Sequence, residues 1–378
     1  ASVAGTGNAT VAVTAPVINF NFAGNTVTTA NQNITFTGAV LLGAASSVTT
    51  GAGTAGDISF SSTIDNANNL SLTAGTGNVL ITGAVGGVTP LSQFSIVSAT
   101  QTDVNNISGT NISITSGNID LNGTVYTAST DDVVFTGSVD LEAGAATAVS
   151  AGAGAGDDVT FTSTVNGGVA LTVNGGGTTT FSGIVGGTIN LASLTTDAAG
   201  TTAINTSAVT TTGVQTYNDN VTLGAGATLT GTTVTFNGTT NGGANNLTVT
   251  GNAVFGNAIA DTVTNVSALT VSGTTTINTS TITTATTQSY NLAVTLGTDV
   301  TLTGTTGTFT TGITGGGNSL TLNFSGITLI NGTFTGILNL TTDAVGTTQL
   351  SGNITTAGFQ SYGDAVVLVG NTVLTTTN

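Results

Sequence analysis

The stretch TTTINTSTITTATTQSYNLAVTLG, residues 274–297, decides which fold the sequence predicts. More than half of it is Thr, Ser and Asn, yet Ile, Leu, Val and Ala return at short intervals. Thr and β-branched apolar residues favour strands, and alternation of apolar with small polar residues is typical of half-buried strands. Gly and Asn at the ends of such runs favour turns. The stretch therefore predicts short β-strands joined by tight turns, and no segment of the chain shows a helical pattern.

The stretch has two relatives in the chain, residues 201–224 and 347–370, which share its Gln-Ser/Thr-Tyr triplet. Their tyrosines, Tyr217, Tyr290 and Tyr362, are 73 and 72 residues apart. Two further anchors keep the same order: Leu70, Leu171, Leu247 and Leu320, and then Phe94, Leu194, Leu269 and Leu340. The first gap is about 100 residues long, and its surplus lies near residues 105–127. Because the surplus is about one anchor-to-anchor step, it predicts a structure of stacked units that tolerates one extra unit.

These repeats predict an all-β fold, a parallel β-solenoid of about 20–25 residues per coil with a super-repeat of about 73 residues, or about three coils. We expect a single continuous solenoid over residues 1–378. Its approximate super-repeats are 30–130, 131–220, 221–293 and 294–366, with a partial one at 367–378.

The composition fits this architecture. Coils of a solenoid lie about 4.8 Å apart, so that like side chains stack. Stacked Thr and Asn side chains satisfy one another, whereas stacked like charges repel, and only 4% of the residues are charged. We expect Val, Ile, Leu and Ala to fill a narrow interior. The alternative is a string of β-sandwich domains, which explains the one-coil surplus less well.

The chain has 378 residues and no Lys, Arg, His, Cys, Met or Trp. It therefore lacks thiolate nucleophiles, His or Cys metal ligands, and bases that titrate near neutrality apart from carboxylates. A net charge of −16 without any cation argues against nucleic acid and anionic membranes as partners. No apolar run is long enough to span a membrane as a helix. Trypsin-like proteases find no cleavage site, a property expected of a durable extracellular material.

The segment TTDAAGTTAINTSAVTTTGVQTYNDNVTLGAGATLTG, residues 196–232, resembles the repeats of filamentous-haemagglutinin-like exoproteins and autotransporter passengers of Gram-negative bacteria. Residues 274–304 and 341–370 carry the resemblance less fully, and it covers most of the chain from about residue 30. It implies a right-handed β-helix, secretion, and a role in adhesion or matrix. The family's N-terminal secretion-guiding domain and its C-terminal barrel or pro-domain are missing, so the resemblance implies part of a shaft or a minimal member.

Acidic residues are the remaining candidates for chemistry. Six of the sixteen lie between residues 131 and 158: Asp131, Asp132, Asp140, Glu142, Asp157 and Asp158. Asp140 and Glu142 are expected to share one strand face. We expect solvated turn carboxylates; calcium bridging is the alternative, although the G-G-x-G-x-D calcium motif is absent. A carboxylate-pair glycosidase is the natural enzyme hypothesis, but aromatic platforms and basic residues for sugar are lacking.

The recurring tyrosines predict packed positions rather than a ligand-stacking row. Thr runs resemble the flat T-x-T faces of ice-binding solenoids, but irregular coil lengths argue against that function. Asn-x-Ser/Thr sequons, for example at Asn33, Asn246, Asn265 and Asn353, are about as frequent as the composition predicts and do not indicate glycosylation.

Neither end of the sequence resembles a cap, and the start, ASVAGTGN, fits a processed N-terminus or an internal fragment. Uncapped coils predict either further protein or subunits joined head to tail, which generates filaments. We therefore expect a secreted, non-enzymatic structural protein of a cell surface or extracellular fibre, with self-association as its main contact. The alternative is an adhesin that binds a glycan or host surface. We predict no catalytic, cofactor-binding or metal residues and no cofactor, with calcium as the one candidate ion.

Overall fold

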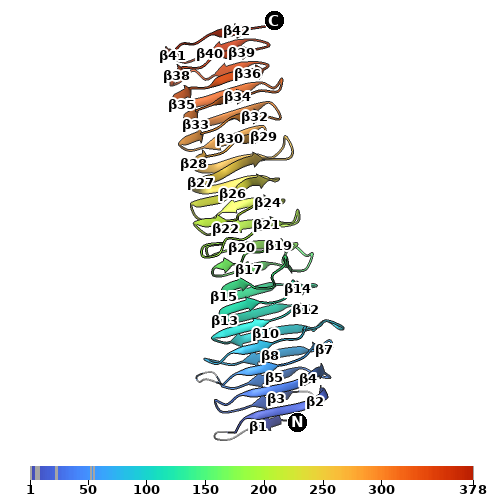
Figure 1. The fold of residues 1–378 in the computed structure, drawn as a ribbon. Coiled ribbons are helices and arrows are strands. Elements are labelled where there is room, and N and C mark those ends of the chain that lie inside the picture. Colours follow the sequence, from blue (N-terminus) through green and yellow to red (C-terminus); the bar gives the residue numbers. More distant parts are fainter. Residues whose placement is uncertain (1, 5–8, 22–23, 52, 54–55, 378) are drawn as a thin grey trace. The chain divides into compact units, whose positions relative to one another are not determined.

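The computed structural model describes residues 2–4, 9–21, 24–51, 53 and 56–377. These residues form 42 strands and no helix, and the strand pairs within each compact unit are parallel. This confirms the predicted all-β parallel β-solenoid and excludes tandem β-sandwiches. Two compact units, Ala1–Gly200 and Thr201–Asn378, divide the chain, and in each of them strands lie one above another (Figure 1).

The first unit holds the strands up to β21. They are β1 (Ser2–Ala4), β2 (Val11–Phe20), β3 (Asn25–Thr28), β4 (Ile34–Leu42), β5 (Ser46–Thr49), β6 (Ile58–Phe60), β7 (Ile64–Asp65), β8 (Asn69–Thr73), β9 (Val79–Ile81), β10 (Gln93–Ser98), β11 (Gln101–Val104), β12 (Ile107–Gly109), β13 (Ile112–Leu121), β14 (Val125–Ala128), β15 (Val133–Leu141), β16 (Thr147–Ser150), β17 (Val159–Phe161), β18 (Val165–Asn166), β19 (Ala170–Asn174), β20 (Thr178–Phe181) and β21 (Ser193–Thr196).

The second unit holds the remaining strands. They are β22 (Thr201–Ile204), β23 (Ala208–Thr210), β24 (Gln215–Tyr217), β25 (Asn220–Leu223), β26 (Ala227–Phe236), β27 (Thr240–Phe255), β28 (Thr262–Val271), β29 (Thr275–Ile277), β30 (Thr281–Thr284), β31 (Thr287–Tyr290), β32 (Val294–Leu296), β33 (Val300–Phe309), β34 (Gly312–Thr314), β35 (Leu320–Ile330), β36 (Thr333–Ile337), β37 (Leu340–Thr342), β38 (Thr347–Leu350), β39 (Ile354–Thr356), β40 (Gln360–Tyr362), β41 (Ala365–Leu368) and β42 (Leu374–Thr376).

Along each strand, apolar side chains that point into the interior alternate with side chains that point outward. In β15, Val133, Phe135, Val139 and Leu141 are buried, and the residues between them are not. The strand bends at Gly137, which has a φ of 136°. A Cβ there would lie 1.8 Å from the Ser116 carbonyl oxygen, so only glycine allows the next coil to pack at this corner.

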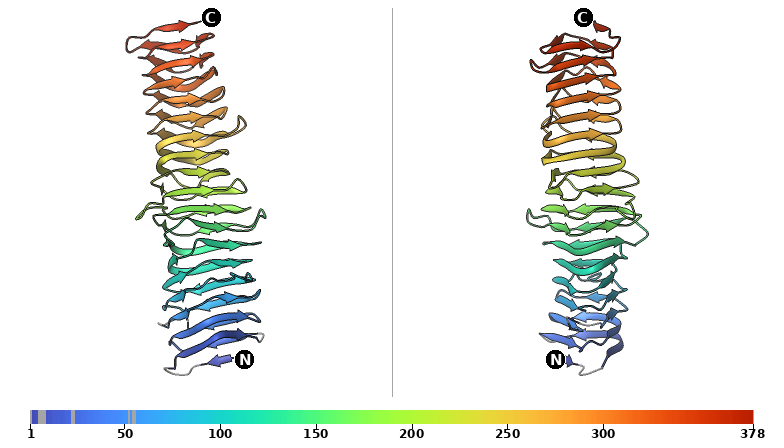
Figure 2. Two further views of the ribbon diagram at one scale, coloured as in Figure 1. Left: turned by 45° about the vertical axis from the view of Figure 1, so that its right-hand side comes forward. Right: turned by 90° about the vertical axis from the view of Figure 1, so that its left-hand side faces the viewer.

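Each coil of the solenoid has three strand positions, because a strand pairs with the position three places further along the chain. In the second unit, β22 pairs with β25, and β23 and β24 pair with the two halves of β26. Long strands therefore occupy two positions, and β27 occupies three. The two side views show the resulting stacks within each unit (Figure 2).

Coil lengths follow from the residues that pair. In the first unit they range from 17 residues, between Gln101 and Asn118, to 26, between Val133 and Val159. In the second unit the range is 18 to 23, set by Thr347 with Ala365 and by Thr240 with Val263. The predicted 20–25 residues therefore fits many coils, while the shortest and the longest lie outside that range.

The 73-residue super-repeat does not span three coils, as the sequence had indicated. From Tyr217 to Tyr290, and again from Tyr290 to Tyr362, the chain advances eleven strand positions, or three coils and two thirds. Tyr217 stacks on Phe236, whereas Tyr290 stacks on Phe309 on another face. Equivalent residues of successive super-repeats therefore lie on different faces.

The surplus in the first gap is one coil, as predicted. From Leu70 to Leu171 the chain advances fourteen strand positions, if the single-residue bridge at Val85 is counted, instead of eleven. The difference is the three positions of one complete coil.

Aromatic side chains fill the interior, which the sequence prediction of small aliphatic residues missed. Phe161 and Phe181 stack at 5.4 Å between ring centroids, as do Phe236 and Phe255. Rings that stack at about the coil spacing interact favourably and bury much apolar area.

Candidate functional site

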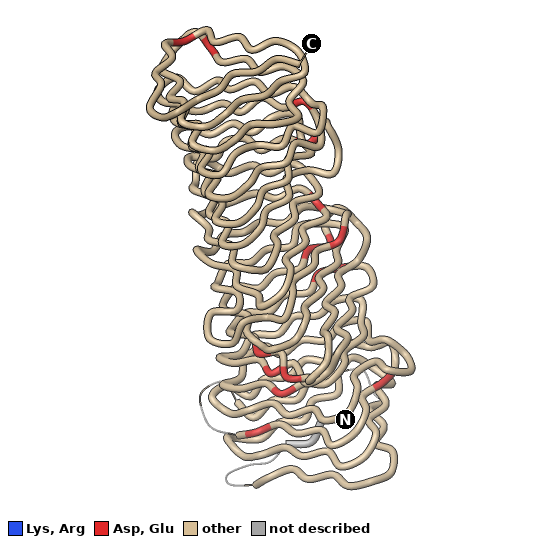
Figure 3. The backbone as a smooth tube through the Cα atoms, turned by 45° about the horizontal axis from the view of Figure 1, so that its top comes forward, with Lys and Arg blue, Asp and Glu red and all other residues tan. Residues whose placement is uncertain are grey.

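Two of the acidic residues predicted as candidates, Asp132 and Asp158, bond to the coil that follows them. The Asp132 carboxylate accepts the backbone N–H of Asp158 at 2.8 Å, and the Asp158 carboxylate accepts that of Thr178 at 2.6 Å. Each carboxylate thus satisfies a backbone donor about one coil further along the chain. Figure 3 shows that Asp and Glu gather in several places along the backbone, without any Lys or Arg beside them.

The other two members of the predicted pairs act within their own turns. Asp131 accepts the backbone N–H of Asp132 at 3.0 Å, and Asp157 accepts that of Gly154 at 2.7 Å. Such short-range bonds are the usual way in which Asp stabilises a turn. The arrangement supports turn carboxylates rather than a pair that faces a substrate.

Elsewhere in the chain, asparagine side chains accept backbone N–H groups of the next coil in the same way. The sequence did not predict this role. The Asn220 side chain accepts the N–H of Thr239 at 2.9 Å, and that of Asn353 accepts the N–H of Val373 at 3.0 Å. In each case the Asn or Asp directly precedes a Val or Ile that is the first or second residue of a strand. That dipeptide was the available signal, and it marks a coil-to-coil cap.

Three aspartates stack in register on successive coils and form what we call the acid ladder: Asp103, Asp120 and Asp140. This contradicts the expectation that like charges avoid stacking. Gln101 donates its side-chain N–H to Asp120 at 2.7 Å, and Asn118 donates a second. These amides offset part of the repulsion in a chain that has no cation to do so.

The pKa values of this cluster reflect burial and mutual repulsion. Burial raises the pKa of Asp120 above its usual range, and the Asp103 carboxylate raises it further. Burial also raises the pKa of Glu142, followed by the charges of Asp120, Asp140 and Asp103. Alternating burial places Asp140 and Glu142 on the same outward side, as predicted.

The acids do not form a recognisable catalytic or metal centre. Among the described residues, no group of three or more His, Cys, Asp or Glu side chains is arranged to hold a metal ion. The calcium alternative therefore has no support in the geometry. A glycosidase needs two carboxylates across a substrate groove. None of four described surface grooves is lined by Asp or Glu.

The recurring Gln-x-Tyr triplet forms a buried clamp. The Tyr217 hydroxyl donates to the Gln215 side-chain oxygen at 3.0 Å, and the Gln215 amide donates to the carbonyls of Val209 and Thr230 at 3.0 and 2.8 Å. Because Thr230 belongs to the coil that follows, the clamp ties two coils together. Burial raises the pKa of the Tyr217 phenol well above its usual range, so this hydroxyl stays protonated.

The other copies repeat the clamp. Tyr290 bonds to Gln288 at 2.9 Å and Tyr362 to Gln360 at 3.0 Å. Tyr217 and Tyr290 are fully buried, while Tyr362 is partly exposed. Packed positions are therefore confirmed for the first two. A ligand-stacking row is excluded, because the three tyrosines lie on different faces.

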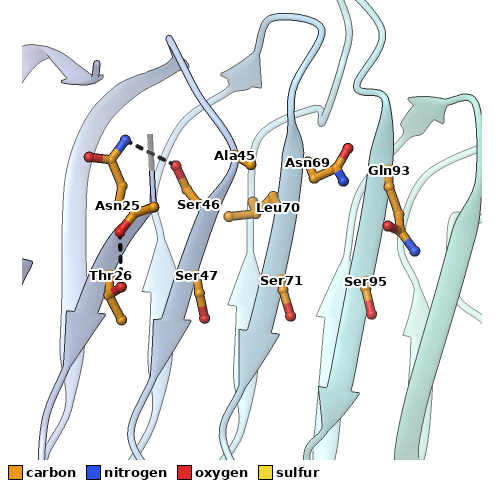
Figure 4. Close-up of a pocket in the computed structure, with 11 residues that line it drawn as sticks. Asn25, Thr26, Ala45, Ser46, Ser47, Asn69, Leu70, Ser71, Gln93 and Ser95 are labelled. Atoms are coloured by element: carbon orange, nitrogen blue, oxygen red, sulfur yellow. Dashed lines mark hydrogen bonds between the residues drawn. The ribbon is translucent and has the colours of Figure 1, made fainter. Parts of the chain in front are cut away.

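One groove crosses the outer face of β3, β5, β8 and β10. Its volume is about 370 Å³, and Thr26, Ser47, Ser71 and Ser95 form a row of hydroxyls along it (Figure 4). These four residues pair in register. The amides of Asn69 and Gln93 lie beside the row, so the groove offers neutral hydrogen-bonding groups.

Comparison with known proteins finds no matching family model, no matching curated relative and no matching solved structure. Among the residues that the structure describes, no helix could cross a membrane. The resemblance to filamentous-haemagglutinin-like repeats therefore stays a prediction.

Proposed function

We propose that this chain is a non-enzymatic, secreted structural protein whose rigid β-solenoid forms an extracellular fibre or an adhesin shaft. The observation that carries the proposal is the parallel ladder within each unit, in which backbone bonds, aromatic stacks and side-chain caps all connect one coil to the next. The absence of Lys and Arg, which leaves no trypsin-like cleavage site, supports a role outside the cell.

The last strands of the second unit expose apolar side chains whose register partners in the preceding coil are buried. Leu374 is 47% exposed, whereas its register partner Ile354 in the preceding coil is 0% exposed. Leu368 is 64% exposed, and its partner Leu350 is 0% exposed. A further layer of strands would bury these side chains and pair the free strand edges. We propose that a second copy supplies that layer, a heterologous contact that extends into a filament.

Electron cryo-microscopy of the purified chain tests this function. We expect filaments with an axial repeat of about 4.8 Å, the strand spacing. Leu374→Asp is expected to shorten or abolish them because it places a charge in the proposed joint. Val88→Asp adds the same charge at a loop side chain that is 86% exposed, and it is expected to leave the filaments intact. Single particles of the unmodified chain at all concentrations would contradict head-to-tail assembly.

The hydroxyl groove of Figure 4 favours a second candidate function, an adhesin that binds a neutral glycan. Its Ser and Thr hydroxyls and its Asn and Gln amides can donate and accept hydrogen bonds to sugar hydroxyls. Glycan-array binding that Ser71→Tyr abolishes would support this candidate. Equal binding by the variant would exclude the groove as the site.

A further inference from the structure

Among the described residues, one edge of β2 and one edge of β41 face no other strand. β2 pairs with β4 alone, and β41 pairs with β38 alone. Each of these open edges therefore presents a row of backbone N–H and C=O groups that another strand can pair with. The inference that follows rests on the head-to-tail contact of the proposed function, and it names the two surfaces that meet and their register.

The open edge of β41 leaves inward side chains uncovered. Leu368 is 64% exposed and Val366 is 42% exposed, although their register partners Leu350 and Thr348 are both 0% exposed. Leu368 is the most exposed large apolar side chain of the last coil. The coil therefore gains most apolar burial from a strand laid on β41.

The open edge of β2 is uncovered along its first half. Val11 and Val13 point inward and are half-buried, whereas their register partners in β4 are buried. Ile18 and Phe20, the inward residues of the second half, are each only 8% exposed. The first half of β2 is thus the part of this strand that a further strand would cover.

The backbone of β2 shows which residues face the open edge. Val11 donates its N–H to the carbonyl of Asn33 at 3.0 Å, so its backbone groups face the next coil. In a parallel ladder the N–H and C=O of one residue face the same neighbour, and those of the next residue face the other neighbour. The backbone groups of Ala12 and Thr14 therefore face the open edge.

The open edge of β41 has the complementary alternation. The Leu350 carbonyl accepts the N–H of Val369 at 2.9 Å, so the backbone of Val369 faces β38. By the same alternation, Val366 and Leu368 turn their N–H and C=O groups to the open edge. Inward residues of β41 and outward residues of β2 thus present the backbone groups that complete a parallel ladder.

Charge favours a second copy placed end to end over one placed side by side. Every acid lies between Asp57 and Asp364, and residues 1–56 carry no charge. The Asp364 carboxylate accepts the hydroxyls of Thr342 and Thr348 in the preceding coil, each at 2.8 Å, so it is already bonded away from the open edge. The sides of two copies repel, because the chain has a net charge of −16 and no cation.

We propose that β41 of one copy pairs with the first half of β2 of the next copy, with Val366 beside Val11 and Leu368 beside Val13. The match covers the exposed inward side chains of both edges and continues the parallel ladder at the strand spacing of about 4.8 Å. Pro16 has no N–H to donate, but it lies at the bend of β2, outside the residues that pair with β4.

Cross-linking of the full chain tests this register, since the protein has no cysteine of its own. In the proposed joint the outward residues Val367 and Ala12 become register partners. Chains with Val367→Cys are mixed with chains with Ala12→Cys and oxidised mildly, and non-reducing electrophoresis measures the linked dimer. We expect about tenfold more dimer than from either control pair, because a disulfide needs Cα atoms within about 7 Å.

Two control pairs report on other joints. Val367→Cys with Thr14→Cys tests a shift by two residues, a pair that lies about 8 Å apart in the proposed register. Val367→Cys with Asn19→Cys tests a joint rotated onto the second half of β2. Ala12, Thr14 and Asn19 are all exposed, so differences in dimer yield report on geometry rather than on access.

The outcomes separate this register from head-to-tail assembly itself. Filaments in which a control pair links as well as the Ala12 pair would overturn the register and leave head-to-tail assembly standing. Dimers formed by Val367→Cys chains alone would show that two copies of β41 meet, which contradicts both. Chains that remain single particles and do not link would also contradict both, and would leave the open edges to a strand of another protein.

Discussion

Two copies of the same repeat in the second unit, residues 201–224 and 274–297, differ at one informative position. In the first copy, the Thr202 hydroxyl donates to the Asp219 carboxylate at 2.8 Å. In the second copy, Leu292 takes the place of Asp219, and the buried hydroxyl of Thr275 has no hydrogen-bond partner among the described residues. Both copies nevertheless keep the Gln-x-Tyr clamp.

The comparison separates the Gln-x-Tyr clamp, which both copies keep, from the Thr–Asp bond, which only the first copy has. The clamp is present on two different faces with the same bonds, so it is a local device that works wherever the repeat places it. The Thr–Asp bond is dispensable, because the second copy folds without it. The third copy restores the bond through Thr348 and Asp364, at 2.8 Å.

Removing the clamp tyrosine is expected to have the largest effect. Tyr290→Ala deletes a fully buried ring and should lower the free energy of unfolding by about 3–5 kcal/mol. Tyr217→Ala should cost about the same, because the two clamps are equivalent. Denaturant titration followed by hydrogen exchange of the surrounding coils measures both. Very different costs would show that the face, rather than the clamp, determines stability.

Replacing Thr202 or Thr275 by Val is expected to change the free energy of unfolding less, and by different amounts at the two positions. Thr202→Val removes a donor from the buried Asp219 carboxylate and should cost about 1–3 kcal/mol. Thr275→Val removes a hydroxyl that has no partner and should be neutral or slightly stabilising. Thermal unfolding of the two valine variants provides the matched test. Equal destabilisation would mean that Thr275 has a partner in solution.

Removing one charge from the acid ladder of the first unit should change the free energy of unfolding only slightly. The size of that change depends on pH. Because its pKa is raised in the folded state, Asp120 stabilises the fold most below its unfolded pKa of about 3.8. That contribution is lost as pH rises through the higher folded pKa. Asp120→Asn should therefore raise stability at pH 7 by about 1 kcal/mol, since it removes repulsion from two stacked neighbours.

The control for the ladder is Asp299→Asn, since Asp299 caps Ser319 away from these acids. Unfolding of each variant at pH 4 and pH 7 measures the difference. If Asp120→Asn proves no more stable at pH 7 than the unmodified chain, the amides of Gln101 and Asn118 offset the repulsion completely.

Much of the fold could be predicted from the sequence, because its signals are local. Alternation in segments such as 300–309 indicates strands, and the extra coil follows from the anchor spacing around residues 105–127. The three-sided coil could not be derived in this way, since the super-repeat of eleven strand positions is not a multiple of three. A repeat in sequence therefore differs from a repeat in space. The pairings of Tyr217 with Phe236 and of Tyr290 with Phe309, on different faces, reveal this.

The candidate sites were less predictable for a related reason. Asp132 and Asn220 have the same capping role, but they belong to different chemical classes and were not grouped. The acid ladder depends on which strands become neighbours, and Asp103 and Asp120 give no local sign of their pairing. Stacked aromatic rings were missed because Phe is scattered along the chain and meets only through the coil.

Disulfide trapping tests the three-sided coil most directly, because the chain has no cysteine of its own. Thr216 and Thr235 are register partners in adjacent coils, whereas Thr216 and Ser289 are equivalent residues of successive super-repeats. Adjacent coils place their Cα atoms about 4.8 Å apart, which a disulfide can bridge. We expect the double variant Thr216→Cys with Thr235→Cys to cross-link on mild oxidation, and Thr216→Cys with Ser289→Cys to remain reduced. The opposite result would contradict the eleven-position super-repeat and the coil on which it rests.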